Sequence, residues 1–279
     1  MARRTWISAS GDASATASWS GGVVPVAGDV VIFEPNGSVA PTAGLNFAGV
    51  YFDTIFISEG FDKPIGSHTN PWISEATVLT HHGDCPLFYK TSDPVGSNFT
   101  RYVTVDSPYQ KGSAATFSSD GVSLFWDLNI IRGHVDWTGD VQFLRATIGT
   151  LNAAQTRKRA SLKIGYSASA IPDTITLNSG MVESHIGAIG TGPRYIINGG
   201  TWHQVEGGLD AVVLRDGSLI YDAASNLTTL FLDGGTADFS GRNVSRTITH
   251  VIQTGGELIH GSGTTITNYR DTRERRRPK

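Results

Sequence analysis

Five carboxylates lie within thirty residues in the second half of the sequence, and they are the first candidates for chemistry: Asp210, Asp216, Asp222, Asp233 and Asp238. Paired carboxylates can act as general acid and general base on a glycosidic bond, and Arg215 could stabilise an anionic sugar. However, Asp233 occupies a turn position that Asn holds elsewhere, and Asp216 and Asp222 flank expected turns. Carboxylates in turns commonly bond the local backbone, and we favour this interpretation over a glycan-cleaving site.

Metal-capable side chains gather in "HHGDC", from His81 to Cys85. Zinc sites usually draw ligand pairs from separated segments, and no second cluster is evident. We therefore interpret this segment as a surface loop and expect no metal. The remaining histidines along the expected strands are interpreted as lining an outer face or a subunit contact: His134, His185, His203, His250 and His260.

Sequence signatures of catalysis are otherwise missing. Cys85 has no nucleophile signature around it, and the Gly-x-Ser-x-Gly, His-Glu-x-x-His and phosphate-loop motifs are absent. "GAIGTG", from Gly187 to Gly192, lacks the following helix that dinucleotide binding requires. We therefore predict that the chain is not an enzyme and needs no cofactor.

Composition indicates a turn-rich β protein. The 279 residues include 33 Gly and only 17% charged residues, with a net charge of -3. Glycine supplies turns, and so small a charge predicts no general attraction to nucleic acid. One cysteine excludes an internal disulfide and indicates either a reduced compartment or a fold that needs no disulfides. We expect no secretory signal and no membrane span.

The charge is concentrated at one end of the sequence. The segment "RDTRERRRPK" holds six Lys/Arg and two Asp/Glu, so the rest of the chain sums to -7 by difference. A basic end on an acidic body predicts docking onto an acidic partner or a polyanion. The residues expected to bind that partner come from both termini: Arg3, Arg4, Arg270, Arg273, Arg275, Arg276, Arg277 and Lys279.

A strand, a glycine turn and a second strand recur through the second half. The last glycine of each turn serves as an anchor: Gly180, Gly200, Gly217, Gly235 and Gly256. The spacings of 20, 17, 18 and 21 residues suit one coil of a parallel β-helix. Apolar residues recur five and three positions before the anchor and two after it, although Gln253 breaks the pattern. Alternation of this kind places those side chains in a shared core.

The sequence therefore predicts an all-β protein built around a parallel β-helix, or solenoid. We expect the solenoid over residues 121–268, with Leu177, Ile197, Leu214 and Leu232 stacked in its core. Residues 1–120 lack this periodicity and are expected to form an irregular β-rich cap or base domain, while residues 269–279 are expected to form a basic tail. A Greek-key sandwich also makes short strands with glycine turns, but without an aligned register.

The opening "WSGGVVPVAGDVVIF" resembles the start of many bacterial and phage right-handed parallel β-solenoid proteins, and the glycine corners resemble the same broad group. This group includes autotransporter-like adhesins and phage virion proteins. Because the adhesins carry export signals, the resemblance favours the virion proteins. It implies assembly in the host cytoplasm and residence in the virion.

The resulting expectation is a structural, non-enzymatic virion protein of a tailed bacteriophage, either a head decoration (cement) protein or a fibre. Its expected partners are the major capsid protein or another virion protein and further copies of itself in a homotrimer, with no nucleic acid and no membrane. Two alternatives stay open. One is a β-helix polysaccharide depolymerase or lyase, and the other is a glycan-binding adhesin or tail-fibre module.

Overall fold

The structure is a computed structural model of the whole chain. It describes residues 1–37, 39–91, 100–119, 125–138, 143–150, 160–165, 174–185 and 194–273. The chain is all-β, with 56% strand and 3% helix, and forms a parallel β-solenoid of about nine turns. It divides into two compact units, Met1–Gln142 and Phe143–Lys279. No helix among the described residues is long and apolar enough to cross a membrane.

The described residues of the first unit form two short 3-10 helices and eight strands. The helices are η1 (Thr16–Ser18) and η2 (Ser20–Gly22). The strands are β1 (Arg3–Thr5), β2 (Val30–Phe33), β3 (Asn46–Ile57), β4 (Trp72–His81), β5 (Leu87–Thr91), β6 (Thr100–Asp106), β7 (Ala115–Ser119) and β8 (Phe125–Trp137).

Parallel pairing in the first unit starts at its first strand. β1 pairs with β2, β2 with β3, and β3 with β4. The long strands then divide between two sheets: β4 pairs with β5 near Trp72 and with β6 near His81. β8 likewise pairs with β6 at its start and with β7 at its end. A strand that bends across two sheets forms two sides of one coil.

Large aromatic side chains fill the core of the first unit. Trp6 and Trp19 are completely buried, and their rings meet edge to face with centroids 5.1 Å apart. Phe33 contacts Trp72 edge to face at 5.5 Å, and Phe47 stacks on Trp72 at 4.8 Å. Such pairs contribute roughly 0.5–1.5 kcal/mol each beyond the area that they bury.

The described residues of the second unit form thirteen strands that alternate between two layers. One layer holds β9 (Phe143–Ile148), β11 (Thr174–Leu177), β13 (Arg194–Ile197), β15 (Leu209–Leu214), β17 (Leu227–Leu232), β19 (Arg246–Gln253) and β21 (Thr264–Asp271). The other layer holds β10 (Ala160–Ile164), β12 (Met181–Ser184), β14 (Thr201–Gln204), β16 (Ser218–Tyr221), β18 (Thr236–Phe239) and β20 (Glu257–His260).

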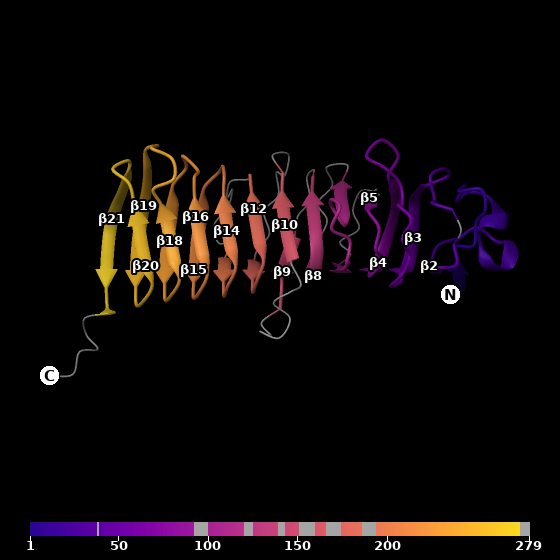
Figure 1. Cartoon of the computed structure of the whole chain (residues 1–279), viewed down its shortest axis with the longest axis horizontal. Helices are drawn as coiled ribbons and strands as arrows, with labels where there is room; N and C mark the ends of the chain where they lie inside the picture. Colours follow the sequence, from indigo (N-terminus) through magenta and orange to yellow (C-terminus); the bar gives the residue numbers. More distant parts are fainter. Residues whose placement is uncertain are drawn as a thin grey trace. The chain divides into compact units, whose positions relative to one another are not determined.

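Within each layer, every strand pairs in parallel with the strand two places further along the chain. Figure 1 shows β12, β14, β16, β18 and β20 following one another in the second layer. The first layer repeats the pattern from β9 through β21. Each coil thus contacts the coil before it and the coil after it, as in other solenoids.

The predicted core of the second unit is confirmed. Leu177 is in register with Ile197, Ile197 is in register with Leu214, and Leu214 is in register with Leu232. All four side chains are completely buried. Gln253 continues this column on the next coil. It is also buried, and its amide Nε2 donates a hydrogen bond of 2.9 Å to the carbonyl of Gly256. A hydrogen-bonded amide can therefore occupy the position where the apolar pattern fails.

The corner glycines are required by both conformation and space. Gly217 and Gly235 have positive φ angles of 82° and 67°. A Cβ at Gly217 would overlap the carbonyl oxygen of Gly200, and one at Gly235 would overlap the carbonyl oxygen of Gly217. Those carbonyls accept hydrogen bonds from the N–H groups of Ser218 and Thr236 on the following coil. Close backbone stacking at the corner therefore excludes any side chain.

Polar side chains just before these glycines bond between coils. Asn198 Nδ2 donates to Asn178 Oδ1 at 2.9 Å, and Arg215 donates to Asn198 at 3.2 Å. Asp233 accepts a bond of 2.7 Å from the Thr254 hydroxyl of the next coil. Carboxylates in turns commonly bond the local backbone, but the contacts of Asp233 and of the two Asn side chains form a ladder from coil to coil.

The expected irregular cap over residues 1–120 is not confirmed, because parallel pairing already joins the strands from β1 onward. In the sequence, the boundary between the two compact units falls after Gln142, and the division at residue 120 stays a prediction. At the other end, β21 pairs with β19 as far as Asp271. The last strand therefore extends into the segment that we had expected to be a tail.

Candidate functional site

The candidate acids lie on the coils, and most of them have local structural partners. Asp216 accepts a bond of 2.7 Å from the N–H of Gly217 within its own turn. Asp238 accepts bonds of 2.8 and 2.7 Å from the N–H and hydroxyl of Ser240. Asp233 bonds Thr254 as described above. The contacts of Asp216 and Asp238 agree with the turn interpretation, whereas the contact of Asp233 joins two coils. Of the other two acids, Asp210 lies on β15 and Asp222 pairs with a histidine.

The sequence reasoning missed an ion-pair row that runs across β10, β12 and β14 and the residues directly after β12 and β16. Its members are Lys163, Glu183, His185, His203 and Asp222. Glu183 lies 2.9 Å from Lys163 and 2.7 Å from His185, while His203 lies 2.9 Å from Asp222. Hydrogen bonds from His185 and Lys163 lower the pKa of Glu183.

The ion-pair row could have been found in the sequence. Glu183 and His203 are paired across β12 and β14, and each stands three residues after its anchor glycine. Because the side chains are part-exposed, each pair stabilises the fold by only about 0.2–1 kcal/mol. The row carries no argument for catalysis.

The "HHGDC" segment does not form a metal site. His81 and Cys85 are completely buried, whereas His82 is half-buried and Asp84 is exposed. The ring Nε2 of His81 lies 3.0 Å from the carbonyl oxygens of both Cys85 and Ala114. No group of three or more His, Cys, Asp or Glu side chains among the described residues could hold a metal ion. The segment is also more deeply buried than the surface loop that we had expected.

Burial controls the ionisation of both groups in that segment. Desolvation lowers the pKa of His81 to about 4, against the hydrogen bonds to Ala114 and Cys85 that favour the charged form. Burial, followed by the charges of Asp84 and Asp62, raises the pKa of the Cys85 thiol to about 12. His81 is therefore a neutral donor, and Cys85 is a protonated thiol.

Some of the arginines expected to bind a partner form ion pairs within the chain, and others are exposed. Arg4 forms an ion pair of 3.2 Å with the buried Asp29, whereas Arg3 is exposed. Arg270 is exposed on β21, and Arg273 binds Asp271, with a shortest contact of 2.5 Å. The remaining residues of this set lie outside the described residues: Arg275, Arg276, Arg277 and Lys279.

An apolar row faces outward on the first layer of the second unit. Ile196, Val213, Phe231 and Ile252 are neighbours on β13, β15, β17 and β19. Phe231 is 37% exposed and the other three are half-buried. Outward positions of a solvated sheet are normally polar. Each member stands four residues before its anchor, so the sequence contained this signal, but our reading considered only the inward positions.

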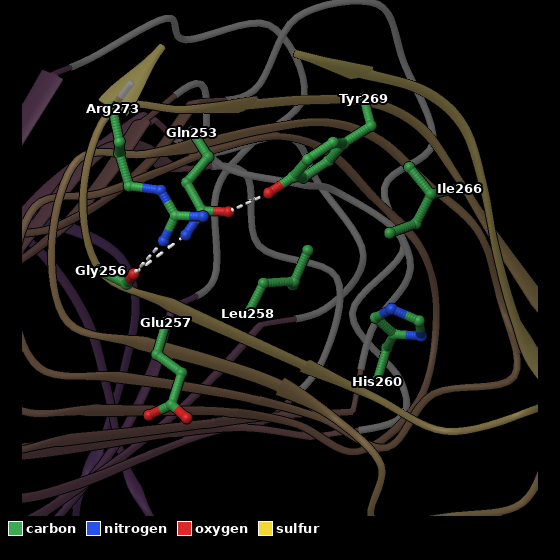
Figure 2. Close-up of a pocket in the computed structure, with 8 residues that line it drawn as sticks. All are labelled: Gln253, Gly256, Glu257, Leu258, His260, Ile266, Tyr269 and Arg273. Atoms are coloured by element: carbon green, nitrogen blue, oxygen red, sulfur yellow. Dashed lines mark hydrogen bonds between the residues drawn. The ribbon is translucent and has the colours of Figure 1, made fainter. Parts of the chain in front are cut away.

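The end of the second unit at β20 and β21 is a second candidate contact surface. A cavity of about 310 Å³ opens there. Figure 2 shows Leu258, Ile266 and Tyr269 around this hollow, with Arg273 and Gln253 meeting at the carbonyl of Gly256. These side chains come from the last coil of the solenoid. The described residues therefore offer surfaces for contact more clearly than a catalytic centre.

Comparison with known proteins does not identify the chain further: no protein-family model, no curated protein and no solved structure matches it. The solenoid fold is therefore established from the structure alone. The virion role and the partners expected from the resemblance are taken up below as proposals.

Proposed function

We propose that this chain is a non-enzymatic structural protein of a tailed-phage virion that decorates or cements the capsid surface. The observation that carries the proposal is the uniform register of the second unit, in which coil after coil repeats the same inward positions and corner glycines. Continuous hydrogen-bonded layers of this kind make a stiff body, because each coil is held by its neighbours. The virion role is proposed because the Trp19–Phe33 segment resembles the start of solenoid virion proteins.

The structural partners of the acids support a role without catalysis. Asp216, Asp233 and Asp238 accept hydrogen bonds from their own turns or from the next coil. The test is incubation of the protein with polysaccharides of the host surface, followed by assay for new reducing ends and unsaturated sugars. We expect no release. Release that is lost in Asp233→Ala, and retained in the control Asp210→Asn, would instead support the depolymerase alternative.

We propose that attachment to the capsid uses the basic residues of the termini. An exposed ion pair contributes about 0.2–1 kcal/mol, so several must act together, and salt should weaken them all. The test replaces Arg275, Arg276, Arg277 and Lys279 with Gln and measures occupancy on particles that lack this protein, at low and high salt. We expect lower occupancy for the variant and a smaller dependence on salt.

A matched control neutralises exposed basic residues elsewhere, namely Lys111, Arg194 and Arg242. This control should bind as the unchanged protein does. Equal occupancy of the Gln variant and the unchanged protein would remove the C-terminal residues from the mechanism. Arg3 at the other terminus would then be the next candidate.

The apolar row supports the proposed homotrimer, because side-by-side association would cover Val213, Phe231 and Ile252. Phe231→Ser should weaken a lateral trimer without disturbing the core, since this side chain points outward. Sedimentation analysis measures the effect. A trimer that is unchanged by Phe231→Ser would show that the copies associate through another face.

A further inference from the structure

Within the described residues, the core of the second unit is uncovered at β20 and β21. Val251 on β19 is 1% exposed, whereas Tyr269, its register partner on β21, is 50% exposed. Ala237 on β18 is completely buried, whereas its partner Leu258 on β20 is half-exposed. The difference arises because another coil covers Val251 and Ala237, while no described residue covers Leu258 and Tyr269. Within the part of the chain that the structure describes, apolar side chains at inward positions are therefore left exposed.

Hydrogen bonds fix the positions of the side chains that form this surface. The Tyr269 hydroxyl donates a bond of 2.6 Å to Gln253 Oε1, and Gln253 Nε2 donates to the Gly256 carbonyl at 2.9 Å. Arg273 reaches the same carbonyl at 3.3 Å (Figure 2). The cavity of about 310 Å³ beside these groups is therefore preformed. A surface that is already ordered loses little entropy on binding.

The strands at this end also have an open edge. Within the described residues β21 pairs with β19 alone, and β20 with β18 alone. An edge strand presents unpaired N–H and C=O groups that another strand can bind. The occupant that suits this end must therefore supply both a strand and apolar side chains.

The order of inward residues in β21 is symmetrical. The buried residues of β19 are Arg246, Ile248, Val251 and Gln253, which makes their partners Thr264, Ile266, Tyr269 and Asp271 the inward residues of β21. These four positions read the same in both directions about the Thr267–Asn268 bond. When two copies of β21 pair antiparallel about that bond, Ile266 lies opposite Tyr269 and Thr264 opposite Asp271. Inward residues thus meet inward residues.

We propose that the uncovered end is a two-fold contact with a second copy of this chain, made by antiparallel pairing of β21 with β21. Residues directly opposite in an antiparallel pair share a face, so the apolar side chains of Ile266 and Tyr269 cover each other twice. On the outer face Thr265 lies opposite Arg270, and Thr267 opposite Asn268. No like charges oppose one another, and the patch is self-complementary, as a two-fold interface requires.

The contact does not depend on the proposed virion role. It is a property of free copies in solution, and a capsid surface that binds the same end would displace it. A lateral trimer through the apolar row uses another face, and so the two contacts are separable: Phe231→Ser affects the lateral one and changes at Thr265 affect the end contact.

The first test changes one exposed, outward residue. Thr265→Glu places a carboxylate opposite Arg270 at two symmetric positions, and Thr265→Lys places a like charge there. Sedimentation equilibrium should show a tighter dimer for the first and a weaker dimer for the second, each by about three- to tenfold at low salt. The matched controls Thr228→Glu and Thr228→Lys, on an exposed residue of β17, should leave the dimer constant unchanged.

The second test fixes the register. A mixture of Thr267→Cys and Asn268→Cys proteins should form an intermolecular disulfide under mild oxidation, because those residues are opposite each other across the contact. The pair Thr265→Cys with Asn268→Cys is out of register and should cross-link far less. The native Cys85 is buried and does not take part.

Two results would overturn the proposal. One is a protein whose mass stays that of a monomer, or of a trimer sensitive only to Phe231→Ser, across the whole concentration range. The other is equal cross-linking by the in-register and out-of-register pairs. Circular dichroism of each variant excludes unfolding as the cause of a lost dimer.

Discussion

Burial shifts the pKa values of two side chains, His81 and Cys85. His81 and Cys85 lie four residues apart in a segment that resembles a metal cluster in sequence, yet burial makes both neutral. His81 donates toward backbone carbonyls of two different segments, at Cys85 and Ala114. Its role is to satisfy backbone groups inside the core, and protonation would place a charge there.

The pH dependence of stability should reveal His81. The unfolded chain takes up this proton near the ordinary pKa of 6.5, while the folded chain does so only near 4. The unfolded state binds more protons between these values, so the free energy of unfolding falls as the pH falls from 6.5 to 4. The loss is on the order of 3 kcal/mol.

Urea titrations at a series of pH values measure this loss, with His81→Gln as the control because an amide keeps a donor and does not titrate. The unchanged protein should lose more stability than His81→Gln over this window. Parallel pH profiles for the two proteins would show that His81 is not the titrating group.

Cys85 should be unreactive in the folded protein. The thiol is completely buried and its pKa is raised to about 12, while thiol reagents attack the thiolate. We expect labelling at pH 8 to be at least about a hundredfold slower than in denaturant, because both access and thiolate fraction are low. Absorbance of the released reagent measures the rate. Rapid labelling of the folded protein would show that the segment opens readily.

At the scale of the elements, the corner between two strands is as constrained as the core. Each corner glycine packs its backbone on the carbonyl of the corner before it, and that carbonyl accepts a hydrogen bond from the next coil. The corner therefore combines a positive φ with a contact that leaves no room for a methyl group. Apolar burial and corner stacking set the same register.

A pair of glycine substitutions should separate these two effects. Gly28 has a φ of 80° and open space around it, so Gly28→Ala should cost only the backbone strain of about 1–2 kcal/mol. Gly217→Ala adds overlap with the Gly200 carbonyl and should cost about 1–3 kcal/mol more. Urea unfolding of both variants measures the difference. Equal losses would show that the corner can widen without cost.

At the scale of the whole molecule, large aromatic side chains near the two described ends of the chain differ in how deeply they are buried. At the beginning, Trp6 and Trp19 are completely buried. At β21, Tyr269 is half-exposed beside an open strand edge. A solenoid end without cover is a site for association, because open edges pair with other strands.

Self-association through β21 should make stability depend on protein concentration. Whatever binds the folded state and not the unfolded state raises the melting temperature by mass action. The melting temperature of the unchanged protein should therefore rise with concentration, and that of Thr265→Lys should rise less. Calorimetry at several concentrations checks this. A melting temperature that is independent of concentration in both proteins would contradict the end contact.

The first half of the sequence shows where pattern reasoning fails. Residues 1–120 lack an even period, yet their strands pair in parallel because loops of unequal length separate strands that still align. Trp72 and His81 belong to one strand that serves two sheets, and no local pattern marks such a bend. The ion pair between Arg4 and Asp29 likewise depends on a turn that returns the chain to its start.

What the sequence by itself determined is the repeating coil of the second half. Alternation about Gly180, Gly200 and the later anchors identified the inward positions, because successive side chains of a regular strand point to opposite faces. Only the tertiary structure decided which side chains remain uncovered. Tyr269 and Val251 have equivalent inward positions, and they differ in exposure because the next coil covers one and not the other. Parity is a local property, whereas cover depends on neighbours distant in sequence.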